Sequence, residues 1–180
     1  MSIPDVCLEG KRGPERVSDR PALLTQRTIG DRLTENMRDS QTMSYQQQIP
    51  VSTKGPGDMH DLTGQVAAIV ASSGVRTGIV NIFNVGSTAA VGTIEFEPGL
   101  QKDLPAMLNK LIPPSRHYGH EQAWHDGNGH SHMQATLLGP SLTVPIADGK
   151  LLLGTWQQIF HLECDVRGRQ RTIYVTVIGD

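Results

Sequence analysis

The chain has 180 residues, of which 37% are hydrophobic and 19% are charged, and its formal net charge is -2. This length suits one domain, or one domain with a tail, and the apolar content argues against a chain that is disordered throughout. No long run of Lys or Arg supplies the electrostatic surface that nucleic-acid binding requires. The composition therefore argues against a nucleic-acid partner.

Two further features bear on the compartment. No apolar run approaches the ~20 residues that cross a bilayer, and the N-terminal sequence MSIPDVCLEGKRGPERVSDR lacks the apolar centre of a signal peptide. We therefore expect a cytoplasmic protein with no membrane partner. The two cysteines, Cys7 and Cys164, argue against a disulfide framework. Cys164 lies in an apolar run and is expected to be a buried, inert thiol rather than a ligand or a nucleophile.

Residues 1–42 are rich in Arg, Asp, Glu, Ser and Thr and show no sustained apolar period. This composition predicts a loosely ordered N-terminal tail. Within it, Ile29, Leu33 and Met37 recur every four residues, which indicates a short helical piece over 27–37 that would be marginal alone. A single domain is expected over residues 43–180.

The first part of this domain predicts a strand followed by a helix. Residues 44–53 are typical of a strand, and glycines then interrupt the pattern. Asp61 is a suitable N-cap, because its carboxylate can accept amide hydrogens at the start of a helix. The helix that follows is expected to bury Val66, Ile69 and Val70.

The middle of the domain predicts two more strands and a second helix. The β-rich runs 77–85 and 89–96 are separated by Gly86-Ser87-Thr88, which favours an antiparallel pair. An amphipathic helix is expected next, because five apolar residues recur at helical spacing before Pro113-Pro114 ends the element. These residues are Leu100, Leu104, Met107, Leu108 and Leu111.

The last part of the chain is a series of short apolar runs, at 132–138, 141–146, 150–153, 157–165 and 171–178. Turn sequences separate them, and Asp148-Gly149 is a strong hairpin signal. The pattern predicts an α+β domain with a large antiparallel sheet and two helices packed on one face.

The run 157–165 has two faces of different polarity. Phe160, Leu162 and Cys164 share the more apolar face, which we expect to face the core. His161 and Glu163 share the other face with Gln157, so these three side chains are expected nearer to solvent or to a subunit boundary.

Five of the seven histidines lie between His117 and His132. In an extended segment His130 and His132 would project to the same side, where two imidazoles can share a cation, and His120 would supply a third ligand. Three histidines with open positions suit zinc or a similar transition ion that holds water or an anionic substrate. The alternative is that each histidine is hydrogen-bonded separately at a loop or a sheet edge.

Two other sequence features have alternative interpretations. His117 and His125 lie in segments that look exposed, so a solvated surface role is expected for each. Trp124 is expected either to cover part of the hydrophobic core or to form a wall of the pocket. The turn at Gly86-Ser87-Thr88 can expose backbone N–H groups to phosphate oxygens. Composition alone favours a plain hairpin turn there.

The order of several short motifs resembles the YjbQ-like family over residues 44–179. These motifs are GSTAA at 86–90, Glu95, Gly99, Asp103, YGH at 118–120, NGHSH at 128–132, LGPS at 138–141, DGKL at 148–151 and LGTWQ at 153–157.

The resemblance implies a compact α+β fold with a bifurcated antiparallel sheet, assembled as a homotrimer with sites near subunit boundaries. It also implies a secondary thiamine-phosphate synthase, which joins hydroxymethylpyrimidine diphosphate to thiazole phosphate and releases pyrophosphate. Carried over by position, the catalytic residues would be His120, Asn128, His130 and His132, and the substrate-binding neighbours would be Ser87, Thr88, Trp156 and Gln157.

One departure from the family pattern concerns catalysis. Many relatives have His-Thr-Thr or His-Ser-Thr where this chain has Gly86-Ser87-Thr88, so the chain would bind without catalysing the same step if that His is catalytic elsewhere.

The resulting hypothesis is that a divalent cation, zinc or magnesium, or the imidazoles directly, bind the phosphate of a small phosphorylated metabolite. The metal ligands would be His120, His130 and His132, and no organic cofactor is indicated. The alternatives are a non-catalytic binding module for a metal or phosphorylated metabolite, a metal-dependent hydrolase and a purely structural trimer.

Overall fold

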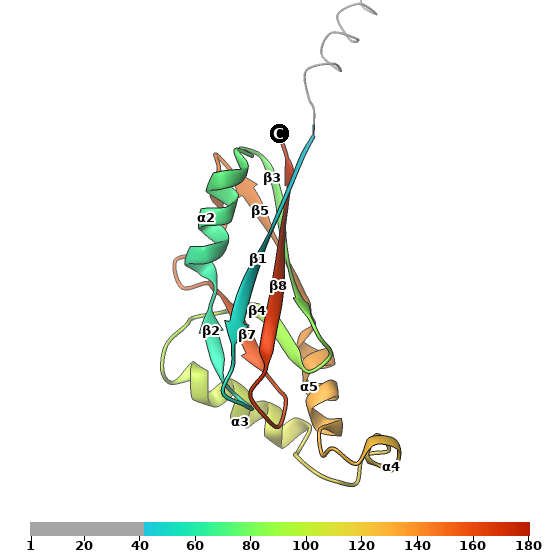
Figure 1. Ribbon diagram of the computed structural model, residues 1–180. Coiled ribbons are helices and arrows are strands. Elements are labelled where there is room, and N and C mark those ends of the chain that lie inside the picture. Colours follow the sequence, from blue (N-terminus) through green and yellow to red (C-terminus); the bar gives the residue numbers. More distant parts are fainter. Residues whose placement is uncertain (1–41) are drawn as a thin grey trace, which may run out of the picture. The chain divides into compact units, whose positions relative to one another are not determined.

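The computed structural model describes residues 42–180 (Figure 1). The expected tail over 1–42, with its helical piece at 27–37, lies outside the described residues except for Thr42. The described chain is an α+β unit with a five-stranded and a three-stranded sheet, both antiparallel. No helix among residues 42–180 is long and apolar enough to cross a bilayer.

The five-stranded sheet has the order β1-β8-β3-β5-β6. The strands expected at 44–53, 141–146, 150–153 and 171–178 all belong to it and are confirmed. Asp148 and Gly149 both have positive φ, 51° and 74°, as the tight hairpin between β5 and β6 requires. The bounds are β1 Met43–Ser52, β3 Gly78–Val85, β5 Ser141–Ala147, β6 Lys150–Leu151 and β8 Gln170–Gly179.

The three-stranded sheet has the order β2-β7-β4, with β2 over Met59–Asp61, β4 over Ala89–Ile94 and β7 over Gln158–Glu163. The expected pairing of 77–85 with 89–96 is therefore wrong, because β3 pairs with β8 and β5 while β4 pairs with β7. The side chain of Asn84 donates hydrogen bonds to the carbonyls of Gly86 and Ala89 (3.2 and 3.4 Å). The turn thus carries the chain from one sheet into the other.

The helices occupy two different layers. Helix α2 (Thr63–Ser73) buries Val66, Ile69 and Val70 in the same hydrophobic cluster as the inner face of the five-stranded sheet. Helices α3 (Leu100–Leu111) and α5 (Gly129–Leu138) place Leu108 and Ala135 in a second cluster, on the other side of the three-stranded sheet. The two expected helices are confirmed as elements, but the expectation that they pack on one face is wrong. A short helix, α4, covers Glu121–Trp124.

The start of α2 is close to the sequence prediction. The carboxylate of Asp61 accepts the amide hydrogen of Thr63 at 2.8 Å, although the cap position itself is Leu62. Asp61 thus satisfies one of the amide groups that the first turn of a helix leaves without a partner.

Strand β7 is buried on both faces, unlike its sequence prediction. Phe160 and Leu162 contact the cluster under α3 and α5 as expected. His161 and Glu163, expected near solvent, are both 0% exposed. β7 is the middle strand of the small sheet and lies between the helices on one side and the five-stranded sheet on the other, so neither face meets water.

The buried imidazole of His161 gives the stability of the fold a pH dependence. Its Nε2 lies 3.2 Å from Oδ1 of Asn84, and burial lowers the pKa of His161 from 6.5 to about 4. The unfolded chain therefore takes up this proton near pH 6.5, whereas the folded chain takes it up only near pH 4. The contribution of neutral His161 to the free energy of unfolding is fully present above pH 6.5 and is lost as the pH falls toward 4.

We predict that His161→Gln reduces this dependence. Urea unfolding of both proteins at pH 7.5 and pH 4.5 should show the wild type losing about 2–3 kcal/mol more than the variant over that interval. Glutamine keeps a hydrogen-bond donor toward Asn84 but cannot titrate. The same loss in both proteins would show that His161 is not the titrating group.

Candidate functional site

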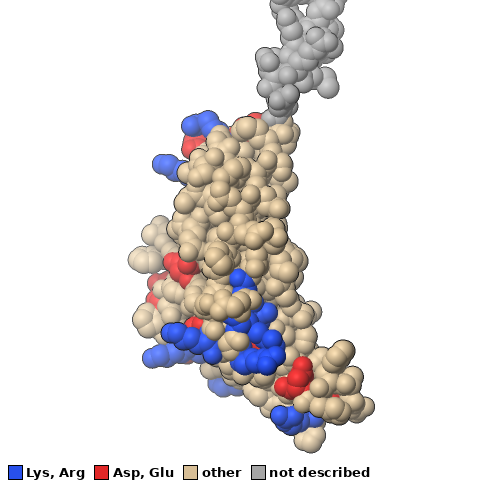
Figure 2. Space-filling view, viewed as in Figure 1, with Lys and Arg blue, Asp and Glu red and all other residues tan. Residues whose placement is uncertain are grey.

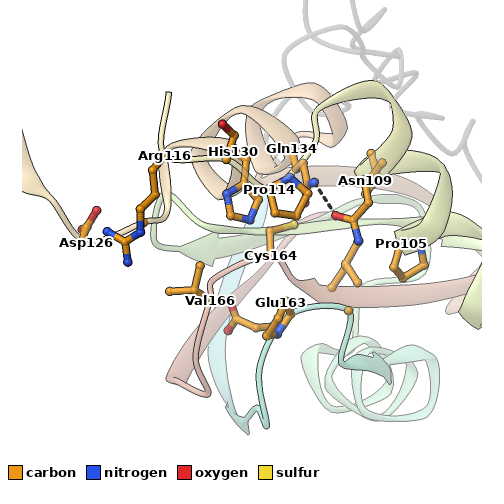
Figure 3. Close-up of a pocket in the computed structure, with 16 residues that line it drawn as sticks. Pro105, Asn109, Pro114, Arg116, Asp126, His130, Gln134, Glu163, Cys164 and Val166 are labelled. Carbon is orange, nitrogen blue, oxygen red and sulfur yellow. Dashed lines mark hydrogen bonds between the residues drawn. The ribbon is translucent and has the colours of Figure 1, made fainter. Parts of the chain in front are cut away.

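A cleft of about 550 Å³ opens beside the N-terminal end of α5 (Figure 3). His130 and Gln134 of α5 lie on one side, Glu163 lies on the other, and Cys164 lies between them. Asn109 of α3 accepts a hydrogen bond from Gln134 at 3.0 Å, which fixes the α3 wall against α5. The remaining lining residues include Pro56, Gly57, Pro114, Ser115, Arg116, Asp126, Gly127 and Val166.

His130 is the buried imidazole of this cleft. It is only 5% exposed, its ring centroid lies 6.4 Å from that of Tyr118, and its Nδ1 has no hydrogen-bond partner among residues 42–180. Burial lowers the pKa of His130 below its usual value, and this effect outweighs the opposite influence of Glu121 and Asp165. His130 is therefore neutral at pH 7, with one ring nitrogen that can donate and one that can accept.

The N-terminus of α5 is held by a buried carboxylate that the sequence analysis did not single out. Glu121 accepts the amide hydrogens of Gly127 at 2.8 Å and Gly129 at 3.2 Å. Gly129 packs so closely that a β-carbon there would lie 2.8 Å from Cβ of Tyr118. A carboxylate at the helix start satisfies free amide groups and the helix dipole, so the segment folds as a helix.

This helix corrects the strand expected at 132–138 and the extended arrangement of the histidines. Two positions apart on a helix, side chains diverge by about 200°. The structure accordingly brings His132 beside His120, with ring centroids 4.7 Å apart, whereas His130 lines the cleft. Nε2 of His120 also lies 3.4 Å from Oδ1 of Asp126.

The metal set of three histidines stays a prediction. In the described part of the chain, no three or more His, Cys, Asp or Glu side chains are grouped so that they could hold a metal ion. The pair His120 and His132, with the Asp126 carboxylate nearby, supplies nitrogen and oxygen donors of the kind that zinc accepts.

Buried polar atoms without partners are concentrated in this region. Six such side-chain atoms occur in residues 42–180, and buried polar atoms in proteins are rarely left unpaired. Four of the six lie within residues 120–131, beside or within the N-terminal part of α5. They are His120 Nε2, Asn128 Oδ1, His130 Nδ1 and Ser131 Oγ.

The predicted substrate-binding residues lie outside the lining of this cleft. Ser87 is exposed, while Thr88 is buried and donates its hydroxyl hydrogen to Asp165 at 3.0 Å. Trp156 is 71% exposed, and Gln157 donates to the hydroxyl of Thr93 at 3.1 Å. A role of these residues in substrate binding therefore stays a prediction.

A buried charged network lies behind the cleft and was not predicted from the sequence. Arg171 of β8 donates through Nε and Nη2 to both carboxylate oxygens of Glu163, and through Nη2 to the Thr88 hydroxyl at 2.8 Å. Arg169 binds Asp165 through its Nε at 2.8 Å. Burial alone would raise the pKa of Asp165, but hydrogen bonds from Arg169 and Thr88 leave it below its usual value.

The signal for this network was the presence of two acids, Glu163 and Asp165, and two arginines, Arg169 and Arg171, at alternate positions beside the turn between two apolar runs. The expectation of a buried, inert Cys164 is confirmed, because burial raises the pKa of that thiol to about 12.

Comparisons with known proteins agree with this fold. The family model "UPF0047 protein YjbQ-like" matches residues 47–180. A UPF0047 protein of Methanothermobacter thermautotrophicus is 42% identical over 135 residues, which cover 75% of this chain and 92% of the relative. UPF0047 protein YugU of Bacillus subtilis is 31% identical over 133 residues, which cover 73% and 97%.

Solved structures show the same similarity. The crystal structure of a YbjQ-like protein of unknown function from Sulfolobus solfataricus superposes with a TM-score of 0.73 at 38% identity, covering 78% of this chain and all of that protein. A hypothetical protein from Aeropyrum pernix gives a TM-score of 0.67 at 30% identity, with 78% and 100% coverage. The chain is a member of the YjbQ-like UPF0047 family.

Proposed function

We propose that the cleft beside His130 binds the phosphate group of a small metabolite in the cytoplasm. The observation that carries this proposal is the buried Nδ1 of His130, which lines the cleft and has no hydrogen-bond partner among residues 42–180. Leaving a buried polar group without a partner costs about 1–3 kcal/mol, so the unpaired Nδ1 favours a bound molecule that satisfies it.

The charges around the cleft suit an anionic ligand. The carboxylate of Glu163 is neutralised by Arg171. Arg116 lines the cleft and donates only a long hydrogen bond, 3.4 Å, to the carbonyl of His125. A guanidinium that is not committed to a carboxylate is well suited to phosphate oxygens.

The reaction proposed for this site is the condensation implied by the family resemblance. Hydroxymethylpyrimidine diphosphate would lose pyrophosphate while the thiazole nitrogen of the second substrate forms the new bond. Arg116 and neutral His130 would stabilise the negative charge that develops on the leaving pyrophosphate by hydrogen bonding to its oxygens.

A divalent cation is part of the proposal. The pair His120 and His132 would hold it, and it would act as a Lewis acid toward phosphate oxygens. Imidazole ligands favour zinc over magnesium, which prefers oxygen ligands.

Elemental analysis of the wild-type protein and of His132→Ala tests whether His132 binds a metal ion. Equal metal content in the two proteins would exclude His132 as a ligand.

We predict that His130→Ala weakens the binding of inorganic pyrophosphate at least about tenfold, since a hydrogen bond to a charged group is worth ~1.5–3 kcal/mol. Calorimetry measures the affinity, and a product assay with the two proposed substrates measures thiamine phosphate. The matched control is His117→Ala, which removes an exposed imidazole from the neighbouring segment.

Two outcomes of this experiment separate the alternatives. Unchanged affinity in folded His130→Ala would refute the cleft as the phosphate site. Tight binding by the wild type with no thiamine phosphate formed would instead support a non-catalytic binding module, the role that Gly86 in place of a family histidine also favours.

We also propose that the chain assembles as a homotrimer. Strands β1, β3 and β5 contain no charged residue, and the one charged side chain of β8, Arg171, is buried. The outer face of the five-stranded sheet, which exposes Ile79, Phe83, Val85 and Ile178, is therefore uncharged on these strands. In the space-filling view, charge is sparse over β1 and β8 and gathers near their loops (Figure 2). An uncharged sheet face of this kind is suited to contact another copy.

We predict that Phe83→Lys, which puts a charge on this face, converts a trimer into a monomer that keeps its circular dichroism spectrum. Sedimentation equilibrium measures the mass. Leu111→Lys on α3, an exposed apolar side chain away from the sheet, should leave the trimer intact. A monomeric wild type, or a trimeric Phe83→Lys protein, would refute the assembly.

A further inference from the structure

Arg171 offers a hydrogen-bond donor that the network behind the cleft does not use. The side chain is 8% exposed, and its Nε and Nη2 are committed to Glu163 and Thr88. Its Nη1 donates no hydrogen bond to any atom of residues 42–180. Nη1 is also absent from the buried atoms that lack a partner, so solvent reaches it.

Gly86 is the reason that Nη1 can be reached. This residue is exposed, and its φ is 146°. Residues other than glycine rarely adopt this backbone conformation. A β-carbon at this position would lie 2.8 Å from Nη1 of Arg171. Any larger residue in this conformation would therefore cover the guanidinium or displace it.

The turn next to Gly86 adds further free donors. Within residues 42–180, the backbone amides of Ser87 and Thr88 donate no hydrogen bond, and the Ser87 hydroxyl makes none. Successive backbone N–H groups in a turn next to a glycine form a common type of anion site. Here they accompany a buried guanidinium that is paired with Glu163 but whose Nη1 can still donate to an anion.

The ion pairs behind the turn are balanced, so they do not repel an anion. Arg169 pairs with Asp165 and Arg171 pairs with Glu163, which leaves no net charge from these four groups. Arg167 is exposed and makes no ion pair within the described residues. Lys and Arg side chains also gather where β1 and β8 meet their loops in the space-filling view (Figure 2).

We propose that the turn Gly86-Ser87-Thr88 and Nη1 of Arg171 form a second anion site, which binds a phosphate group of a small metabolite. It goes beyond the proposed function, because Gly86, Ser87, Thr88 and Arg171 do not line the His130 cleft. The two sites meet only at Glu163, which lines the cleft and binds Arg171. The turn is thus a binding site in its own right, whether or not the cleft is occupied.

The test is a titration of the full, isotope-labelled chain with inorganic phosphate, followed by amide NMR. The signals of Ser87 and Thr88 and the Nε–H signal of Arg171 report on the turn. The signal of Gly127, which lines the cleft, reports on that site, so failure of one site is distinguished from failure of the other. We expect the Ser87 and Thr88 signals to move and saturate.

Variants define the role of the uncovered guanidinium. Gly86→Ala should weaken phosphate binding at the turn at least tenfold, because the new methyl group meets Nη1. Gly64→Ala is the matched control, since a β-carbon there has nothing within 4 Å, and His130→Ala should also leave the turn unaffected. Unmoved Ser87 and Thr88 signals in the wild type would overturn the proposal without any variant. Equal affinities in folded Gly86→Ala and wild-type protein would overturn it as well.

Discussion

The buried ion pair between Glu163 and Arg171 joins the two sheets of this protein. Glu163 is on β7 of the small sheet and Arg171 is on β8 of the large one, and both oxygens of the carboxylate accept hydrogen bonds from the guanidinium. Removing one partner of such a pair costs about 3–5 kcal/mol, because the other charge stays buried alone. Thr53, which follows β1 of the large sheet, also binds this carboxylate, since its hydroxyl donates a hydrogen bond to Glu163 at 2.8 Å.

The same pair brings functional groups together. Glu163 forms part of one wall of the cleft, Arg171 reaches the Gly86 turn, and Thr88 contacts both Arg171 and Asp165. On the opposite wall, the Glu121 carboxylate fixes the start of α5 and thereby the position of His130. The two buried carboxylates, Glu163 and Glu121, are thus already satisfied by the protein. The charged and polar side chains that the cleft offers to a ligand include the neutral imidazole of His130, the cationic Arg116 and the partly exposed carboxylate of Asp126.

Local patterns predicted much of the fold. The strands of the large sheet, the Asp148-Gly149 hairpin and the helices α2 and α3 follow from alternation, turn residues and helical spacing. Helix α5 did not, because a short apolar run does not distinguish a helix from a strand, and the carboxylate that starts this helix lies eight residues before Gly129.

Burial of both faces of β7 could not be predicted from its own residues. Alternation assigns one face to the core and the other to solvent, whereas His161 and Glu163 are accommodated by Asn84 and Arg171 from distant strands. The candidate histidines were found by composition. Their division into a pair, His120 and His132, and a cleft residue, His130, depended on α5 and could be seen only in the structure.

The account depends most directly on contact between the His130 imidazole and a phosphate ligand. The decisive measurement is the imidazole nitrogen NMR spectrum of the wild-type chain during titration with inorganic pyrophosphate. The account predicts that the His130 signals move and saturate, while those of His161, buried between the sheets, stay in place. Saturable binding of pyrophosphate with unmoved His130 signals, or no binding at all, would contradict it.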